Sequence, residues 1–203
     1  MYRWTYCRYL ASVKIAARKS QKPRRILGID PGSNVLGYAI VNQVGSHREL
    51  VTMGVHRTPA RATHPEKLRS IFDCITELVI AYQPAECAIE SPFFGKNVQS
   101  MLKLGRAQGV AMAAAIAKGL TVAEYAPKKI KMSVTGGGNA SKLQVAEMAA
   151  AMLNFQADSF PLDATDAVGA AICHLNQTAF GTSTGESYDG WKQFLERNPG
   201  RVG

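Results

Sequence analysis

The fold is decided by the stretch Ile26-Leu27-Gly28-Ile29-Asp30-Pro31-Gly32-Ser33-Asn34-Val35-Leu36-Gly37-Tyr38-Ala39-Ile40-Val41. Two apolar runs flank a short turn, which predicts a β-hairpin whose first strand is buried. Proline, glycine, serine and asparagine are typical of the turn. Asp30 ends the first run, where a carboxylate adds nothing to an apolar core. It either caps the turn or is presented to a functional site, and this stretch alone favours neither.

A second apolar run also ends on an acid. After the hairpin, residues 50–55 predict a third strand, and Thr63 and Glu66 form a capping box at the start of a helix that ends before Pro84. The short run 86–90 follows that helix directly and ends at Glu90. A strand that follows a crossover helix is expected to lie parallel to the first strand.

The next elements alternate between helices and short loops. Residues 98–118 predict a helix, whose small residues Gly105, Gly109 and Ala113 would allow a neighbour to approach closely. Residues 121–126 predict a strand, 127–131 a basic turn or short helix, and 135–139 a glycine-rich loop. A further helix is expected over 141–153. Its inward-facing residues are predicted to be Val145, Met148, Ala149 and Met152.

The final predicted helix, over 163–177, brings two more acids together. Asp163 and Asp166 are three residues apart, so both lie on one face near the helix N-terminus, where negative charge is favoured. Asp163 is explained equally well as an N-cap. Asp166 is harder to explain in this way, because an apolar and therefore buried run follows it. His174 is interpreted as a satisfied core or rim histidine rather than a ligand.

Positive charge is concentrated in two segments of a chain whose net charge is +9. Residues 1–25 hold 8 of the 24 bases and no acid, which leaves 16 bases against 15 acids in the rest. This leader could be a transit-like segment, a nucleic-acid-binding arm, or residues included by a misplaced start codon. The abrupt start of the folded pattern at Ile26 favours the last.

The second basic segment lies inside the folded region. Its bases, against the single acid Glu124, are Lys96, Lys103, Arg106, Lys118, Lys128, Lys129, Lys131 and Lys142. A solvated helical surface usually alternates in sign, so this bias favours binding of a phosphate backbone. Phe93 and Phe94 lie in a loop just before it. They either fill the core or stack on exposed bases, and by themselves they favour the core.

Length and composition fit a soluble protein with one globular domain and extensions, or a very small pair of domains. Hydrophobic residues make up 46% of 203 residues, and no apolar run approaches the roughly 20 residues that cross a bilayer. The cysteines lack paired metal-type spacing; they are Cys7, Cys74, Cys87 and Cys173. Cys74 and Cys87 lie in apolar periodic stretches and suit reduced core thiols of an intracellular protein, which we expect to be cytoplasmic. We expect a basic extension over 1–25, a domain over 26–177 and a flexible tail over 178–203.

Carboxylates on three separate elements suggest a metal centre. Acids brought together repel one another unless cations neutralise them, and oxygen-only ligands suit Mg²⁺ or Mn²⁺. A pair of such ions can hold both the attacking water and the leaving oxygen of a phosphodiester. With a basic segment alongside, the sequence predicts metal-assisted phosphodiester hydrolysis.

The chain resembles the RuvC family of Holliday junction resolvases, in an ordered match from Ile26 to about His174. The motifs that carry the resemblance are Ile26 to Ser33 with Gly37-Tyr38, Ala88-Ile89-Glu90 with Phe93 and Lys96-Asn97, Leu102 to Gly109, Glu124-Tyr125-Ala126, and Asp163-Ala164-Thr165-Asp166-Ala167. The resemblance implies an α/β fold of the RNase H-like type, with a mixed five-stranded sheet flanked by helices. It further implies a homodimer that makes paired, symmetric nicks in four-way DNA junctions, with RuvA and RuvB as partners.

The resemblance also assigns roles to individual residues. It implies a site for two Mg²⁺ ions, for which Mn²⁺ can substitute, formed by Asp30, Glu90, Asp163 and Asp166. Lys131 and Lys142 match the functionally important lysines of the family, and Phe93 matches the aromatic residue that stacks at the junction core. The expected DNA-binding residues are Phe93, Lys96, Lys103, Arg106, Lys128, Lys129, Lys131 and Lys142.

Three alternatives are compatible with parts of the pattern. An actin- or sugar-kinase-like ATPase uses a similar strand, acid and glycine turn, but it needs a second phosphate hairpin and usually a second domain. A non-catalytic DNA-binding module is opposed by the presence of all four acids. An RNase H-like nuclease that acts on another nucleic acid remains the closest alternative.

Overall fold

The computed structural model describes residues 23–92 and 97–180. The strands are β1 (Arg24–Asp30), β2 (Val35–Val44), β3 (His47–Arg57), β4 (Glu86–Glu90) and β5 (Thr121–Tyr125). The helices are α1 (His64–Tyr82), α2 (Val98–Ala117), α3 (Pro127–Thr135), α4 (Lys142–Leu153), the short 3₁₀ helix η1 (Ala157–Ser159) and α5 (Leu162–Phe180). The predicted strands and helices are thus present within the described residues.

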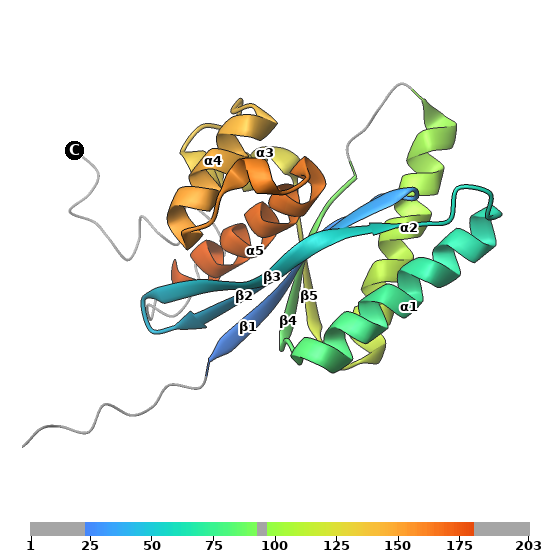
Figure 1. The fold of residues 1–203 in the computed structure, drawn as a ribbon, viewed down its shortest axis with the longest axis horizontal. Helices are drawn as coiled ribbons and strands as arrows, with labels where there is room; N and C mark the ends of the chain where they lie inside the picture. Colours follow the sequence, from blue (N-terminus) through green and yellow to red (C-terminus); the bar gives the residue numbers. More distant parts are fainter. Residues whose placement is uncertain (1–22, 93–96, 181–203) are drawn as a thin grey trace, which may run out of the picture.

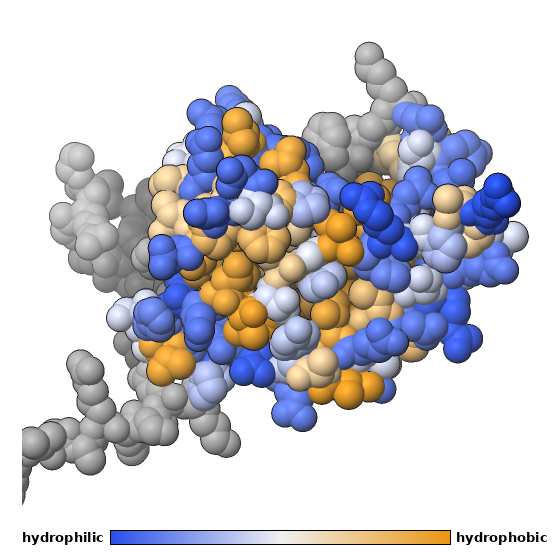
Figure 2. Space-filling view, in the orientation of Figure 1, coloured by the Kyte–Doolittle hydropathy of each residue, from blue (hydrophilic) through white to orange (hydrophobic). Residues whose placement is uncertain are grey.

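The five strands form one mixed sheet in the order β3-β2-β1-β4-β5. β1 pairs antiparallel with β2 and parallel with β4, as the hairpin and the crossover helix predict. Helices α1 and α2 cover one face of the sheet, and α3, α4 and α5 cover the other (Figure 1). On the side shown in Figure 2, hydrophilic residues occupy most of the rim, and hydrophobic residues form separate patches in the middle and at the upper and lower edges.

Alternation along β1 divides its side chains between two cores. Leu27 and Ile29 pack with α1 and α2, whereas Ile26 packs with α5. Because side chains on a strand alternate between the faces, Asp30 is on the α5 side of the sheet. The same rule applies to β4, where Ala88 packs with the α5 core and Glu90 follows two residues later. Both acids therefore face the helix that carries Asp163 and Asp166.

Helix α5 lies unusually close to the sheet. A methyl group at Gly28 would lie 2.1 Å from the carbonyl oxygen of Ala167, and one at Gly37 would lie 1.9 Å from that of Asp163. Both distances are far below van der Waals contact, so only glycine fits at either position. These two glycines set the depth at which the first turns of α5 rest on β1 and β2.

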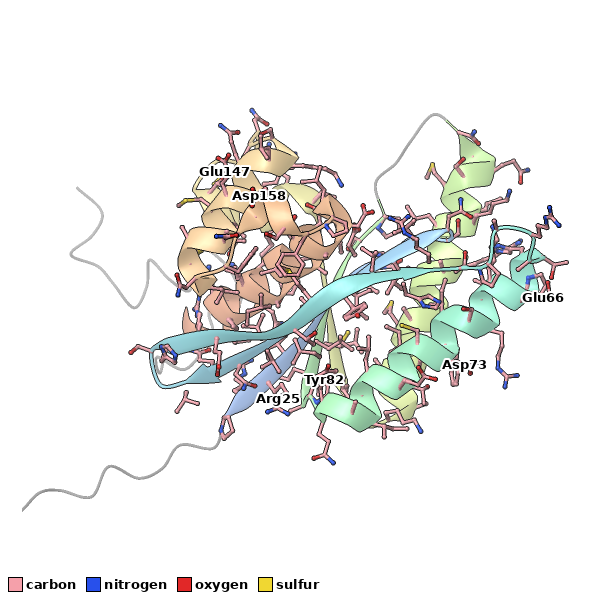
Figure 3. All side chains as sticks on the ribbon, in the orientation of Figure 1. Arg25, Glu66, Asp73, Tyr82, Glu147 and Asp158 are labelled. Carbon is pink, nitrogen blue, oxygen red and sulfur yellow. The ribbon has the colours of Figure 1, made fainter. Side chains whose placement is uncertain are left out.

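Strand β1 begins at Arg24, two residues before the apolar run that predicted it. Arg24 and Arg25 belong to β1, and each has partners from distant segments. Arg24 forms an ion pair with Glu86 and donates to the hydroxyl of Thr178 at 2.6 Å. The guanidinium of Arg25 donates to the carbonyl oxygen of Tyr82, and the two residues lie side by side in Figure 3. Residues 1–22 lie outside the described residues.

The predicted inward face of α4 was wrong at two of its four positions. Met148 and Met152 are 44% and 42% exposed, because α4 packs through the stripe of Val145, Ala149 and Leu153 instead. Of the two explanations for Asp163, the structure does not support the N-cap, since α5 already begins at Leu162. The close approach that Gly105 and Gly109 of α2 would permit is not used within the described residues, where a methyl group at either would meet open space.

In other respects the local signals were reliable. The capping box at α1 is formed, with the Glu66 carboxylate accepting from the Thr63 amide at 2.6 Å. Cys87 and Cys173 are buried free thiols, and Cys74 is partly buried and also free. Among the described helices, none combines the length and apolar character needed to cross a bilayer.

The close approach of α5 predicts a large effect of a single methyl group. Gly28→Ala should lower the free energy of unfolding by about 3 kcal/mol, the upper range for overpacking a core, because backbone atoms of α5 must move. Chemical denaturation measures this. The matched control is Gly137→Ala, where the nearest side-chain atom would be 3.9 Å away and we expect a change within about 0.5 kcal/mol. Equal stability of the two variants would contradict the proposed close contact.

Candidate functional site

Three acids converge where β1 meets the first turns of α5. One carboxylate oxygen from each of Asp30, Asp163 and Asp166 lies within 4.8 Å of the others. Asp30 is delivered by the last position of β1, which pairs with Gly37 across the hairpin. Asp163 and Asp166 are presented by α5, and Asp166 is only 9% exposed. The sequence predicted this grouping, and the structure brings these three acids together.

Glu90 borders the same site from the end of β4. It lines a pocket of about 500 Å³ together with Asp166, Lys131 and Lys142. It does not belong to the group of three within 4.8 Å, but its charge contributes to raising the pKa of Asp30. The fourth predicted acid is therefore adjacent to the cluster rather than inside it.

Burial and crowding disfavour ionisation of two of these acids. Burial, followed by the charges of Glu90 and Asp166, raises the pKa of Asp30 to about 8. Burial, followed by the charge of Asp166, raises the pKa of Glu90 to about 7. A folded protein accepts such a cost mainly where the carboxylates bind a cation or take part in chemistry. Elsewhere on the molecule, the acids labelled in Figure 3, Glu66, Asp73, Glu147 and Asp158, are exposed on the helical layers.

Two lysines partly compensate this negative charge. The ammonium group of Lys142 donates a hydrogen bond to Asp166. Burial opposes the charged form of Lys142, but the hydrogen bond and charge of Asp166, with Asp30 and Asp163, outweigh it and raise the pKa of the lysine. Lys131 acts electrostatically on Glu90 and favours its ionised form. Both predicted lysines thus lie at the acidic site.

Lys142 is held by the capped start of α4. The hydroxyl of Ser141 accepts from the amide of Gln144 at 3.2 Å, and the Gln144 side chain accepts from the Ser141 amide at 2.8 Å. This reciprocal cap fixes the first turn of the helix, in which Lys142 is the first residue. The lysine therefore extends toward Asp166 from a defined backbone position.

The remaining predicted DNA-binding residues are spread around the molecule. Lys128 lines the pocket beside Lys131, and Lys129 lies over the ring of Tyr125 at 5.3 Å from its centroid. Lys103 and Arg106 are exposed on α2, which covers the opposite face of the sheet from α5. They do not line the pocket. Phe93 and Lys96 lie outside the described residues.

His174 belongs to a buried polar cluster at the other end of α5. Its Nδ1 lies 2.7 Å from the Tyr125 hydroxyl, and its Nε2 lies 2.9 Å from the Glu86 carboxylate. The hydrogen bonds from Arg24, and then from His174, keep the pKa of Glu86 near 2 against the effect of burial. The prediction of a satisfied histidine is confirmed.

One residue beside the site had no recognised role in the sequence. Thr58 is 8% exposed and follows β3 directly. Its hydroxyl donates to the carbonyl oxygen of Ser33 at 3.0 Å, and its amide donates to that of Asn34 at 3.0 Å. Both acceptors belong to the turn after Asp30. The only signal in the sequence was a threonine between a predicted strand and Pro59.

Sequence comparison supports the motif assignment. Residues 26–174 match the protein family described as crossover junction endodeoxyribonuclease RuvC. A crossover junction endodeoxyribonuclease RuvC of Bacteroides fragilis is 50% identical over 183 residues, which cover 89% of this chain and 97% of that protein. The protein of the same name from Cytophaga hutchinsonii is 52% identical over 179 residues, which cover 88% of each chain.

Two solved structures of RuvC proteins resemble the fold of this chain. The RuvC structure from Thermus thermophilus superposes with a TM-score of 0.71 at 28% identity, and covers 78% of this chain and 97% of that one. A structure of T. thermophilus RuvC in complex with a Holliday junction substrate gives a TM-score of 0.73 at 29% identity, with the same coverage. The predicted RNase H-like fold is confirmed by these neighbours. This chain belongs to the RuvC family of crossover junction endodeoxyribonucleases.

Proposed function

We propose that this chain resolves four-way (Holliday) DNA junctions by metal-dependent hydrolysis of phosphodiester bonds, in homologous recombination and DNA repair. The observation that carries the proposal is the convergence of Asp30, Asp163 and Asp166 beside a pocket lined by lysines. Acids alone would repel the substrate, and lysines alone would only bind it. Family membership and the junction-bound relative support the choice of a four-way junction over another nucleic acid.

The donor set fits Mg²⁺, with two ions per subunit expected and Mn²⁺ able to replace them. All the candidate ligands are carboxylate oxygens, which these hard cations prefer, and no histidine or cysteine belongs to the described cluster. Asp30, Asp163 and Asp166 would hold the ions, with Glu90 completing the site. Bound Mg²⁺ supplies a water nucleophile and neutralises charge on the phosphate. The raised pKa values of Asp30 and Glu90 support this assignment, because a cation removes the repulsion that causes part of them.

The lysines would serve both the acids and the DNA. Lys142 hydrogen-bonds Asp166 and is 57% exposed at its side chain, so it can orient that carboxylate and still meet a phosphate. Lys131 favours the ionised form of Glu90 and lines the same pocket. Lys128 and Lys129 are exposed at the start of the same helix and extend the positive surface. Lys103 and Arg106 would contact DNA at a distance from the pocket, and Phe93 and Lys96 are proposed on the family resemblance alone.

A homodimer would explain paired cleavage of two strands, and helix α2 offers a suitable surface. Val98, Leu102 and Ile116 of this helix are 65%, 50% and 56% exposed. They lie along a stripe that includes Gly105 and Gly109, where nothing in the described chain approaches. Small residues within an apolar stripe permit close packing of a second helix. We also propose a cytoplasmic location and RuvA and RuvB as partners, on the basis of the family.

Removing one acid should separate binding from cleavage. Asp30→Asn should slow junction cleavage by roughly a thousandfold, as expected when several kcal/mol of transition-state stabilisation are lost, while the affinity for junctions changes little. The measurements are single-turnover cleavage in Mg²⁺ and a gel-shift titration in EDTA. Asp158→Asn, an exposed acid on η1, is the control and should keep wild-type cleavage. Intact cleavage by the Asp30 variant would overturn the assignment of the site.

The pKa shifts predict how pH and metal together affect stability. Protonated Asp30 and Glu90 favour the folded state, so without metal this contribution is full below their ordinary pKa values of 3.8 and 4.5. It is lost as the pH rises through about 7 to 8. The increase in Tm on adding Mg²⁺ should therefore be larger at pH 8.5 than at pH 6, as measured by scanning calorimetry. Asp30→Asn should reduce that difference, and the same increase at both pH values would argue against the metal site.

The α2 stripe makes a prediction about assembly. Leu102→Glu should weaken dimerisation by about tenfold or more, because a charge would be buried in an apolar contact. Sedimentation velocity over a concentration series measures this. Ile80→Glu is the matched control, since Ile80 is 62% exposed on α1 and also apolar. If both variants associate like the wild type, the interface lies elsewhere.

A further inference from the structure

The turn between β1 and β2 holds Asp30 in place, yet most of it lies outside the sheet. Pairing of β1 with β2 ends at Asp30 and Gly37, and pairing of β2 with β3 ends at Val35 and Arg57. Residues 31–34 therefore have no strand partner. The turn is also tight, because a methyl group at Gly32 would lie 1.9 Å from the carbonyl oxygen of Val35.

Thr58 supplies the missing hydrogen bonds from outside the turn. Its amide donates to the Asn34 carbonyl at 3.0 Å, and its hydroxyl donates to the Ser33 carbonyl at 3.0 Å, with a longer contact of 3.3 Å to Asn34. The residue is 8% exposed, so water can only poorly replace the hydroxyl. On the outer side, the ammonium group of Lys67 donates to the side-chain oxygen of Asn34 at 2.7 Å, but this contact is exposed. Of Thr58 and Lys67, Thr58 therefore makes the buried contact with the turn.

The turn matters because residues 31–34 continue directly from Asp30, the last residue of β1. The backbone of Asp30 is therefore held on one side by the pairing of β1 and on the other by the turn. A turn held in one conformation keeps a carboxylate oxygen of Asp30 within 4.8 Å of those of Asp163 and Asp166. Displacements of about 1 Å at such a site can change rates by about a hundredfold.

We propose that the hydroxyl of Thr58 is a positioning group for Asp30, which acts by holding the Ser33 carbonyl and therefore the turn that follows the carboxylate. The inference rests on the proposed metal-dependent function, because its effect is on the metal site. Thr58 touches neither the acids nor the pocket lining. It is therefore a positioning residue and not a catalytic one.

The test separates the effect of the Thr58 hydroxyl from that of the rest of the side chain. Thr58→Val keeps the shape and removes the hydroxyl, and Thr58→Ser keeps the hydroxyl. The full chain is titrated with Mn²⁺ alone by calorimetry well below its Tm, and single-turnover junction cleavage is measured in Mg²⁺. The valine variant should bind Mn²⁺ about tenfold more weakly and cleave about tenfold more slowly or worse, within the range for residues that orient metal ligands. Thr58→Ser should remain within about twofold of the wild type by both measures.

The control is a second threonine, Thr76 of helix α1. The Thr76 hydroxyl in α1 is buried and has no hydrogen-bond partner among the described residues. Thr76→Val makes the same chemical change and should leave both measurements unchanged. If the Thr58 valine variant does not fold, Thr58→Ala against Thr58→Ser gives the same comparison, because these two differ only in the hydroxyl.

The outcomes separate the two proposals. Wild-type Mn²⁺ affinity and cleavage in Thr58→Val would overturn the positioning role and leave the proposed function intact. A lower Tm with unchanged Mn²⁺ affinity would also overturn it, since a purely structural contact has that effect. Equal losses in the serine variant would show that packing matters and not the hydroxyl. If the wild type neither binds Mn²⁺ nor cleaves junctions, the proposed function fails, and the positioning role fails with it.

Discussion

The mutual repulsion of carboxylates gathered in a partly buried place is the constraint on which this structure depends. One carboxylate oxygen from each of Asp30, Asp163 and Asp166 lies within 4.8 Å of the others, although their negative charges repel one another. The contact is imposed by packing. Gly28 and Gly37 allow the backbone of α5 to lie directly on β1 and β2, and the buried face of α5 then holds the helix there. Hydrophobic burial and close backbone contact thus offset the electrostatic cost.

Carboxylates near the two ends of α5 have pKa values shifted in opposite directions. At the far end, Glu86 is paired with Arg24 and His174, and the hydrogen bond from Arg24 helps to bring its pKa down to about 2. At the near end, Asp30 has no comparable partner among residues 23–92 and 97–180, and burial raises its pKa to about 8. A paired carboxylate contributes to the fold, and an unpaired one is available for a ligand. The contrast along one helix separates the structural acid from the candidate functional ones.

The surroundings of the site contribute rigidity as well as charge. Among the residues that the structure describes, Lys142 is the one cation that hydrogen-bonds an acid of the cluster, and it reaches Asp166 from a helix start fixed by a reciprocal cap. Thr58 fixes the turn after Asp30 through two hydrogen bonds. A site in which like charges must stay close needs such supports, because each ligand would otherwise relax away from the others.

The sequence by itself determined the elements, the sheet order near β1 and the identity of the acids. Apolar runs that end in Asp30 and Glu90, a crossover helix between them and an acid pair on a late helix were all readable, because periodicity and turn residues act locally. Only the tertiary structure decided the packing. The sequence suggested that Met148 and Met152 face inward, but α4 rests on α5 through smaller residues. It also could not reveal that Glu90 stands beside the cluster rather than in it, or that Thr58 supports a turn 24 residues away, because such contacts depend on how the layers meet in space.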